Sequence, residues 1–369
     1  MASKNRQPVP EDALNQMQWY LGEETIEDYQ DGLLSRRGML KRLIVICGGS
    51  AAAATILTAC GVPVNAPPPA STTAPAVVAA AATEAATAGA TSEATSAATS
   101  EATAAATTAA TPAAGATAAT TPPPPATPRQ AKGPLSVPDD DAAVQGSDVT
   151  FPGDVELMGY LAKPAAAGTY PGVIVIHENR GLTAHIKDVT RRLAKAGYVA
   201  LAVDLVSRAG GSASTAFDQI AGILSQAKPE DLVKDLGAGV DYLLAQEGVK
   251  QGKVGVVGFC FGGAYTLRLA AANTKVGAAV SYYGPAPQPL EQMANTQAAI
   301  LGQYGGNDAR VNGTIPDMEK VLADAGKTFS KNTYEGANHA FNNDTGANYN
   351  EAAAVQAWQA TLDWFKANL

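Results

Sequence analysis

Apolar and polar positions along residues 133–369 are arranged in blocks that predict strands and helices in turn. Apolar runs such as 173–177 (VIVIH) are nearly continuous, which is typical of strands covered on both faces of a sheet. Other segments, such as 186–196, carry apolar residues at helical spacing. Strands that alternate with helices predict an α/β fold with a doubly wound, mainly parallel sheet and helices on both faces. The predicted strands are a pair over 148–163, then 173–177, 198–203, 254–259, 276–283, 298–304 and 328–334, and the predicted helices are 186–196, 230–246, 262–272, 315–325 and 352–367.

A different pattern occupies residues 1–60. The segment 35–41 (SRRGMLK) is basic and precedes an uncharged run over 43–59, as in a targeting signal. The basic segment resembles the twin-arginine export motif, and 57–61 (LTACG) resembles a bacterial lipobox, in which Cys60 would become lipid-modified. We therefore expect an export signal and a protein that is lipid-anchored to the outer face of a bacterial membrane. An uncleaved signal anchor and a buried helix are the alternatives, since about 17 apolar residues is the lower limit for a span.

Residues 61–132 are rich in Ala, Thr, Pro and Ser. The chain has no aromatic residue between Tyr29 and Phe151 and no Lys or Arg in 43–128, so this segment cannot build a varied core. We expect a disordered linker that holds the folded part, 133–369, away from the membrane.

Composition narrows the range of functions. The formal net charge of −8 gives no support to a nucleic-acid partner. The three cysteines, Cys47, Cys60 and Cys260, rule out a disulfide scaffold, and no CxxC motif is present to hold zinc. We expect no metal and no organic cofactor, and a monomer.

The motif that carries chemistry is Gly258–Gly263 (GFCFGG), between a predicted strand and a predicted helix. It has the Gly-x-nucleophile-x-Gly form of a nucleophile elbow, with Cys260 as the nucleophile. The helix N-terminus beneath Cys260 favours the thiolate and offers a backbone N–H to an oxyanion. The alternative is a buried, inert cysteine in a glycine cluster.

A catalytic base and acid should follow the nucleophile in the chain. His339 is the only histidine after Cys260. Asp308 ends a predicted strand, 308 − 260 = 48 residues after the cysteine and 339 − 308 = 31 residues before the histidine. These residues are therefore the candidate acid and base. A turn aspartate and a surface histidine are the alternatives.

Six segments in this order make residues 150–369 resemble the dienelactone hydrolase family of the α/β-hydrolase fold. The segments are 177–181 (HENRG), 204–208 (DLVSR), the Cys260 elbow, 282–284 (YYG), 306–308 (GND) and 338–341 (NHAF). The cysteine in the elbow and the His-Glu pair at the first segment are the discriminating features.

The resemblance implies a role for each matching residue. It implies a Cys260–His339–Asp308 triad, and Glu178 as the carboxylate that contacts the resting thiol. The remaining assignments are the backbone N–H groups of Phe261 and Asn179 for the oxyanion hole, and Arg208 and Tyr283 for substrate binding. Read without the family, Glu178 could instead form an ion pair with Arg180 or Arg208. Arg208 could instead face the solvent. The chain departs from the family at Asn343, where better-known members carry a second substrate-binding arginine.

We therefore expect a hydrolase that cleaves a small, anionic ester or lactone through an acyl-Cys260 intermediate. The loss of an arginine at Asn343 favours an alternative, a broad carboxylesterase or thioesterase. A third possibility is a non-catalytic lipoprotein that binds a sugar or peptide on the same fold, because fold alone does not establish function.

Overall fold

The structure is a computed structural model of the 369-residue chain, and it describes residues 14–30, 34–60, 62 and 133–369. Residues 1–13 and 31–33 of the predicted export signal lie outside the described part. The predicted linker over 61–132 also lies outside it, except for Val62. The described residues belong to one compact unit, which includes the N-terminal helices as well as residues 133–369.

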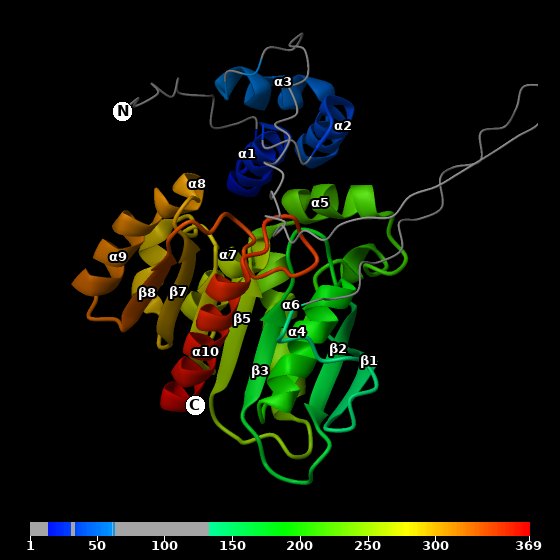
Figure 1. Cartoon of the computed structure of the whole chain (residues 1–369), viewed down its shortest axis with the longest axis vertical. Helices are drawn as coiled ribbons and strands as arrows, with labels where there is room; N and C mark the ends of the chain where they lie inside the picture. The colour runs from blue at the N-terminus through cyan, green and yellow to red at the C-terminus, as the bar shows by residue number, and fades with distance from the viewer. Residues whose placement is uncertain (1–13, 31–33, 61, 63–132) are drawn as a thin grey trace, which may run out of the picture. The chain divides into compact units, whose positions relative to one another are not determined.

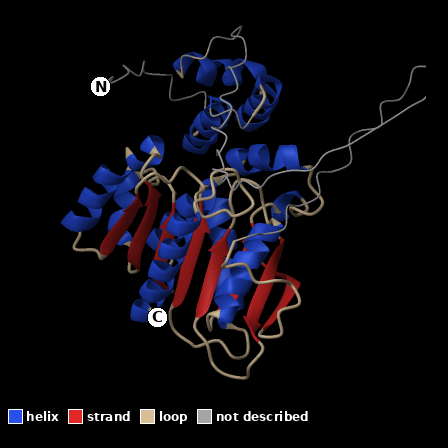
Figure 2. Cartoon of the chain, in the orientation of Figure 1, coloured by secondary structure: helices blue, strands red, loops and turns tan. Residues whose placement is uncertain are grey.

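An eight-stranded sheet with the order β1-β2-β4-β3-β5-β6-β7-β8 forms the centre of residues 133–369 (Figures 1 and 2). β1 pairs with β2, and β2 with β4, in antiparallel fashion, and all the other neighbours are parallel. The strands are β1 (Val144–Pro152), β2 (Glu156–Pro164), β3 (Gly172–Ile176), β4 (Val199–Asp204), β5 (Val254–Phe259), β6 (Val276–Tyr282), β7 (Ala299–Gly305) and β8 (Phe329–Tyr334).

Helices cover both faces of this sheet. α4 and α10 lie on one face, and α6 and α7 lie on the other (Figure 1). Every residue of β3, β4 and β5 is buried, as expected for strands between two layers of helices. The helices of this part are α4 (Ala184–Lys195), α5 (Phe217–Gln226), α6 (Pro229–Leu244), α7 (Phe261–Ala272), α8 (Ala309–Asn312), α9 (Ile315–Asp324) and α10 (Glu351–Asn368), with short 3-10 turns at Ser207–Ala209 and Leu290–Asn295.

Local sequence signals explain where these helices begin and end. The Thr183 hydroxyl accepts a hydrogen bond from the N–H of Ile186 at the start of α4, and Gly197 follows its end with a φ of 92°. α6 begins with Pro229 and has acidic residues in its first turn, which suits the positive end of the helix dipole. The doubly wound sheet predicted from the pattern, and the α/β-hydrolase fold that the resemblance implies, are confirmed, with each predicted strand and helix present.

Three helices precede the sheet: α1 (Gln16–Gln30), α2 (Arg36–Cys47) and α3 (Ser50–Ala59). The Ser35 hydroxyl caps α2 by accepting from the N–H of Gly38. α2 packs against α1, α3 and α5, which buries its apolar side, including Leu43 and Ile46. Cys60, the predicted lipid-attachment residue, is half-buried at the end of α3.

No single helix among the described residues is long and apolar enough to cross a membrane. α2 and α3 meet that test only as a pair, with a bend of 114° between them.

Candidate active site

Cys260 lies in a sharp turn between β5 and α7. Its backbone has a φ of 54° and a ψ of −116°, a region that residues with a side chain rarely adopt. The turn needs glycine on both sides. A Cβ on Gly258 would collide with the carbonyl oxygen of Gly262, and one on Gly262 with that of Ile176. The packing of β5 and α7 therefore produces the elbow that the motif predicts.

His339 and Asp308 meet at the same edge of the sheet, after β8 and β7. His339 Nδ1 lies 2.6 Å from Asp308 Oδ2, and the Asp308 side chain is 2% exposed. Asp308 also caps α8, because its other oxygen accepts from the N–H of Val311 at 3.1 Å. The carboxylate is thus fixed from two directions and orients the imidazole.

Burial and charge act in opposite directions on this pair. Burial alone would lower the pKa of His339, but the Asp308 carboxylate and the Cys260 thiol outweigh it and raise that pKa well above its ordinary value. Burial alone would raise the pKa of Asp308, but His339 reverses the effect and lowers it. The ionised Asp308 carboxylate therefore stabilises the imidazolium that forms when His339 accepts a proton.

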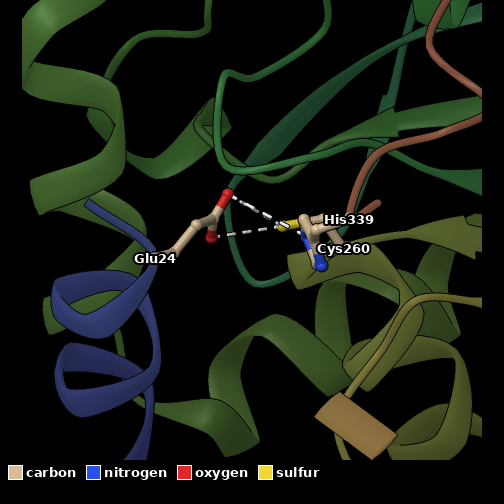
Figure 3. A group of neighbouring side chains, drawn as sticks. All are labelled: Glu24, Cys260 and His339. Atoms are coloured by element: carbon tan, nitrogen blue, oxygen red, sulfur yellow. Dashed lines mark hydrogen bonds and ion pairs between the residues drawn. The ribbon is translucent and has the colours of Figure 1, made fainter. Parts of the chain in front are cut away.

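The thiol of Cys260 lies beside His339 and also beside two side chains from α1. The Tyr20 hydroxyl is 3.5 Å from Cys260 Sγ and 3.4 Å from His339 Nε2. The Glu24 carboxylate points at the sulfur, with its oxygens at 3.5 and 3.7 Å (Figure 3). Neither residue of α1 was anticipated from the sequence, because nothing in a polar N-terminal segment indicates what its side chains contact.

The pKa of Cys260 is raised, contrary to the expectation of a favoured thiolate. Burial is the largest cause, and the Glu24 carboxylate raises the pKa further, against the opposing effect of His339. With α1 in contact, the helix N-terminus of α7 is therefore not enough to favour the thiolate.

Glu178 is buried at the end of β3, but the carboxylate that contacts the thiol is that of Glu24. Glu178 instead accepts hydrogen bonds from Asn343 Nδ2 at 2.8 Å and from the Tyr283 hydroxyl at 3.5 Å. The expectation that Glu178 touches the resting thiol is corrected by this geometry. Asn343 thus holds Glu178 in place.

The two residues predicted for the oxyanion hole flank the sulfur. Phe261 is the first residue of α7, so its N–H belongs to the free donors at a helix N-terminus. Asn179 lines the same pocket after β3, and its side chain donates to Glu24 Oε2 at 3.4 Å. Both positions suit an oxyanion on the substrate, and their roles remain predictions.

The two predicted substrate-binding residues differ in position. The fully buried Tyr283 ring lies 4.9 Å from the His339 ring, between centroids, so this tyrosine supports both the base and Glu178. Arg208 does not line the pocket. Its guanidinium donates two hydrogen bonds of 2.8 Å to the buried Asp235 carboxylate and contacts Asp154 at 3.4 Å. Arg208 therefore pairs with carboxylates of the protein itself, and the structure gives it no contact with the candidate active site.

Arg310, which the sequence interpretation overlooked, lies near the triad but lines a neighbouring pocket with Tyr20 rather than the pocket that contains Cys260. It lies in α8, two residues after Asp308, and its side chain is only 7% exposed. Its Nε donates to Glu27 Oε2 at 3.0 Å, and the Tyr20 ring lies 4.2 Å from the guanidinium carbon. Both terminal nitrogens are buried without a hydrogen-bond partner among the described residues. Its nearness in the chain to the candidate acid was the signal that could have identified it.

A pocket of about 270 Å³ lies beside the triad and α1 and is lined by residues of both. α1 contributes only carboxylates to its lining, and Arg180 is the one arginine or lysine among the described residues of the lining. The lining residues that bear charge or chemistry are Glu24, Glu27, Asp28, Glu178, Arg180, Cys260, Asp308 and His339.

One group of side chains here could hold a metal ion. The ligand atoms of Glu24, Cys260 and His339 lie within 4.8 Å of one another (Figure 3). Carboxylate, thiolate and imidazole together suit zinc. The thiolate and imidazole are also the proposed nucleophile and base, so an ion bound there would occupy the atoms that the reaction needs.

Comparisons with known proteins agree with this geometry. The model of the dienelactone hydrolase family matches residues 157–369, more than half of the chain. A "Putative carboxymethylenebutenolidase" of Methylorubrum extorquens is 36% identical over 225 residues, which cover 58% of this chain and 77% of the relative. A protein of the same name from Synechocystis is 33% identical over 237 residues, which cover 60% of this chain and 96% of the relative.

Solved structures give the same result. The crystal structure of a "Putative Dienelactone Hydrolase" from Klebsiella pneumoniae superposes with a TM-score of 0.57 at 32% identity, covering 61% of this chain and 99% of that one. The family and the fold that the sequence motifs predict are thus confirmed. The chain belongs to the dienelactone hydrolase family and is a hydrolase.

Proposed function

We propose that this hydrolase cleaves a small carboxylic ester or lactone through an acyl-Cys260 intermediate. The observation that carries the proposal is the His339–Asp308 pair, with a 2.6 Å hydrogen bond, beside the thiol of a strained elbow. A cysteine with a histidine oriented by a third group is the arrangement that nucleophilic acyl transfer requires.

The reaction follows from the positions of these groups. Cys260 Sγ attacks the carbonyl carbon while its proton passes to His339 Nε2. The tetrahedral oxyanion accepts hydrogen bonds from the N–H groups of Phe261 and Asn179. The alkoxide then leaves with the proton from His339. A water molecule next gives a proton to His339 and attacks the thioester, which releases the carboxylic acid and restores the thiol.

An anionic substrate is supported by Arg310 rather than by Arg208. Arg310 lies two residues after the proposed acid and has two nitrogens without a partner among the described side chains, whereas Nε and Nη2 of Arg208 donate to Asp235. A guanidinium suits the bidentate binding of a substrate carboxylate. Arg180, which lines the pocket, adds a second positive charge.

A broad carboxylesterase or thioesterase is the second candidate. Asn343 binds Glu178 in the position where relatives carry an arginine, so one of the two carboxylate contacts of the family is absent here. A binding lipoprotein without catalysis is disfavoured, because such a protein has no need of a buried His339–Asp308 pair beside a thiol.

Export and lipid attachment at Cys60 remain part of the proposal. They are supported by the basic segment 35–41, the uncharged run that follows and the lipobox-like sequence 57–61. The hydrolase would then act outside the cytoplasm on a small-molecule substrate.

The proposal is tested by assaying the full chain and its Cys260→Ala variant on dienelactone and on a neutral short-chain nitrophenyl ester. We expect turnover by the wild type and none above background by the variant. A preference for the lactone supports the anionic substrate, and a preference for the neutral ester supports a general esterase. Equal turnover by the variant would contradict a Cys260 nucleophile.

A further inference from the structure

The helix α1 contacts the candidate active site through its acidic side and one tyrosine. The Tyr20 hydroxyl reaches both Cys260 Sγ and His339 Nε2, at 3.5 and 3.4 Å. The Glu24 carboxylate meets the same sulfur (Figure 3), and it also accepts a hydrogen bond from the side chain of Asn179. The nucleophile, the base and one side of the predicted oxyanion hole are thus all in contact with α1.

α1 also covers the positive charge that an anionic substrate would use. The Glu27 carboxylate accepts from Arg310 Nε at 3.0 Å, and the Tyr20 ring covers the guanidinium at 4.2 Å. The carboxylate of Glu27 thus neutralises the guanidinium from the Nε side, and the two terminal nitrogens that would bind a substrate carboxylate are buried. A covered arginine of this kind cannot bind a second carboxylate bidentately.

The remaining pocket would repel an anion. α1 places Glu24, Glu27 and Asp28 in its lining. Arg180 is the one arginine or lysine among the described residues of that lining. Like charges in a partly buried site oppose entry more strongly than they would in water. An anionic ester therefore meets neither a free thiol nor a free Arg310 while α1 is in this position.

Contacts away from the catalytic atoms hold α1 in place. Gln16 donates from Nε2 to the carbonyl of Ala286 at 3.1 Å and accepts from Arg268 at 2.9 Å. Asn15 donates to the carbonyl of Ser225 at 2.8 Å, and the Leu21 side chain is fully buried. These side chains have no part in the proposed reaction, so the first half of the helix is held on this surface independently of the catalytic atoms.

We propose that α1 is an intramolecular ligand of the active site, and that the hydrolase is latent while α1 occupies it. The proposal deepens the proposed function and rests on it for the reaction that is blocked. Removal of a segment that ends at Cys60 would take α1 with it. The latent form is then the form that still carries its N-terminal segment.

The test compares the full chain with a variant whose α1 contacts are weakened away from the triad. In Gln16→Ala/Glu27→Lys, the contacts to Ala286 and Arg268 are lost and a lysine faces Arg310. The readout is the rate at which iodoacetamide alkylates Cys260, followed by mass spectrometry of the peptide that contains this residue. This identification separates Cys260 from Cys47 and Cys60. We expect the rate to rise by about tenfold or more, since charged hydrogen bonds are lost.

The matched control is Gln359→Ala/Glu247→Lys, the same two changes at exposed positions of residues 133–369. We expect alkylation of this control at the wild-type rate. A second variant, Tyr20→Ala, removes the side chain that touches Cys260, His339 and Arg310 together, and should accelerate alkylation on its own. Wild-type rates in both α1 variants would overturn the latency.

Hydrolysis of a nitrophenyl ester by the same proteins separates this proposal from the one on which it rests. Faster alkylation with no hydrolysis by any variant supports occlusion by α1 and contradicts the proposed reaction. Hydrolysis by the full chain at the rate of the α1 variants, with equal alkylation, contradicts latency and leaves the proposed reaction standing.

Discussion

The sheet edge and the helix α1 contribute to the same site by different means. Cys260, Asp308 and His339 follow β5, β7 and β8, so the parallel strands themselves bring them together. Tyr20 and Glu24 arrive from the other end of the sequence, on a helix held by side-chain contacts. The first arrangement is fixed by backbone geometry, whereas the second can be released by losing a few hydrogen bonds.

The difference extends to charge. The sheet edge pairs its charged side chains, as in His339 with Asp308. α1 adds the Glu24 carboxylate next to the thiol, and it raises the pKa of Cys260 beyond the effect of burial, which is the larger cause. In the function proposed above, the sheet edge supplies the reacting groups, and the helix disfavours the thiolate among them.

The largest effect should come from breaking the sheet-edge pair. In Asp308→Asn the amide can still cap α8, but it no longer stabilises a protonated His339. We expect kcat/KM for a nitrophenyl ester to fall by roughly 10³–10⁴, with a thermal unfolding midpoint close to that of the wild type. A fall of only twofold would mean that Asp308 caps the helix and does not orient the base.

Arg310 lies in α8, which follows β7, and it contacts Tyr20 and Glu27 of α1. Its substitution therefore affects both the sheet edge and the helix. Arg310→Gln should lower kcat/KM for an anionic ester by about tenfold relative to a neutral ester, because one charged contact is lost. The readout is the ratio of kcat/KM for the anionic ester to kcat/KM for the neutral ester, because loosening of α1 would change both values together. Arg310→Lys keeps the charge and should recover part of the ratio. An unchanged ratio would contradict a carboxylate site at Arg310.

Tyr20→Phe tests the hydroxyl of α1 alone. The ring stays over Arg310, while the contacts with Cys260 Sγ and His339 Nε2 are lost. We expect iodoacetamide to alkylate Cys260 about fivefold faster, as the loss of one hydrogen bond allows. Tyr29→Phe removes a hydroxyl from another buried tyrosine of the same helix and serves as the control. Equal rates in the two variants would mean that the Tyr20 hydroxyl does not protect the thiol.

The smallest expected effect is a pH dependence of α1. Burial, with Glu24 adding to it, raises the pKa of Asp28 to about 6, against the effects of Arg42, Arg180 and His339. A carboxyl whose pKa is raised in the docked helix favours docking when protonated, and this contribution is lost as the pH rises through about 6. Corrected for intrinsic exchange, hydrogen exchange in α1 should be about threefold slower at pH 5 than at pH 7.

Asp28→Asn is the control for this pH effect, because its side chain no longer titrates and the difference should disappear. Slower exchange in wild-type α1 at pH 7 than at pH 5 would reverse the sign and contradict the role given to Asp28.

The sequence predicts the strands, and the meeting of Cys260, Asp308 and His339 at one edge of the sheet, because the signals for them are local. The glycines around Cys260 are needed at one turn, and His339 is the only histidine that follows it. Contacts between distant residues leave no such signal. The pairing of Arg208 with Asp235 and the approach of Glu24 to Cys260, 236 residues away, depend on packing that periodicity does not encode.

The most direct test of the central claim is mass spectrometry of the full chain, quenched in acid during turnover of nitrophenyl acetate. We expect an acetyl group on the peptide that contains Cys260. This acetylation should be absent from Cys260→Ala and should accumulate faster in Gln16→Ala/Glu27→Lys than in the wild type. Steady hydrolysis with the acetyl group on another residue, or with Cys260 unmodified at every quench time, would contradict it.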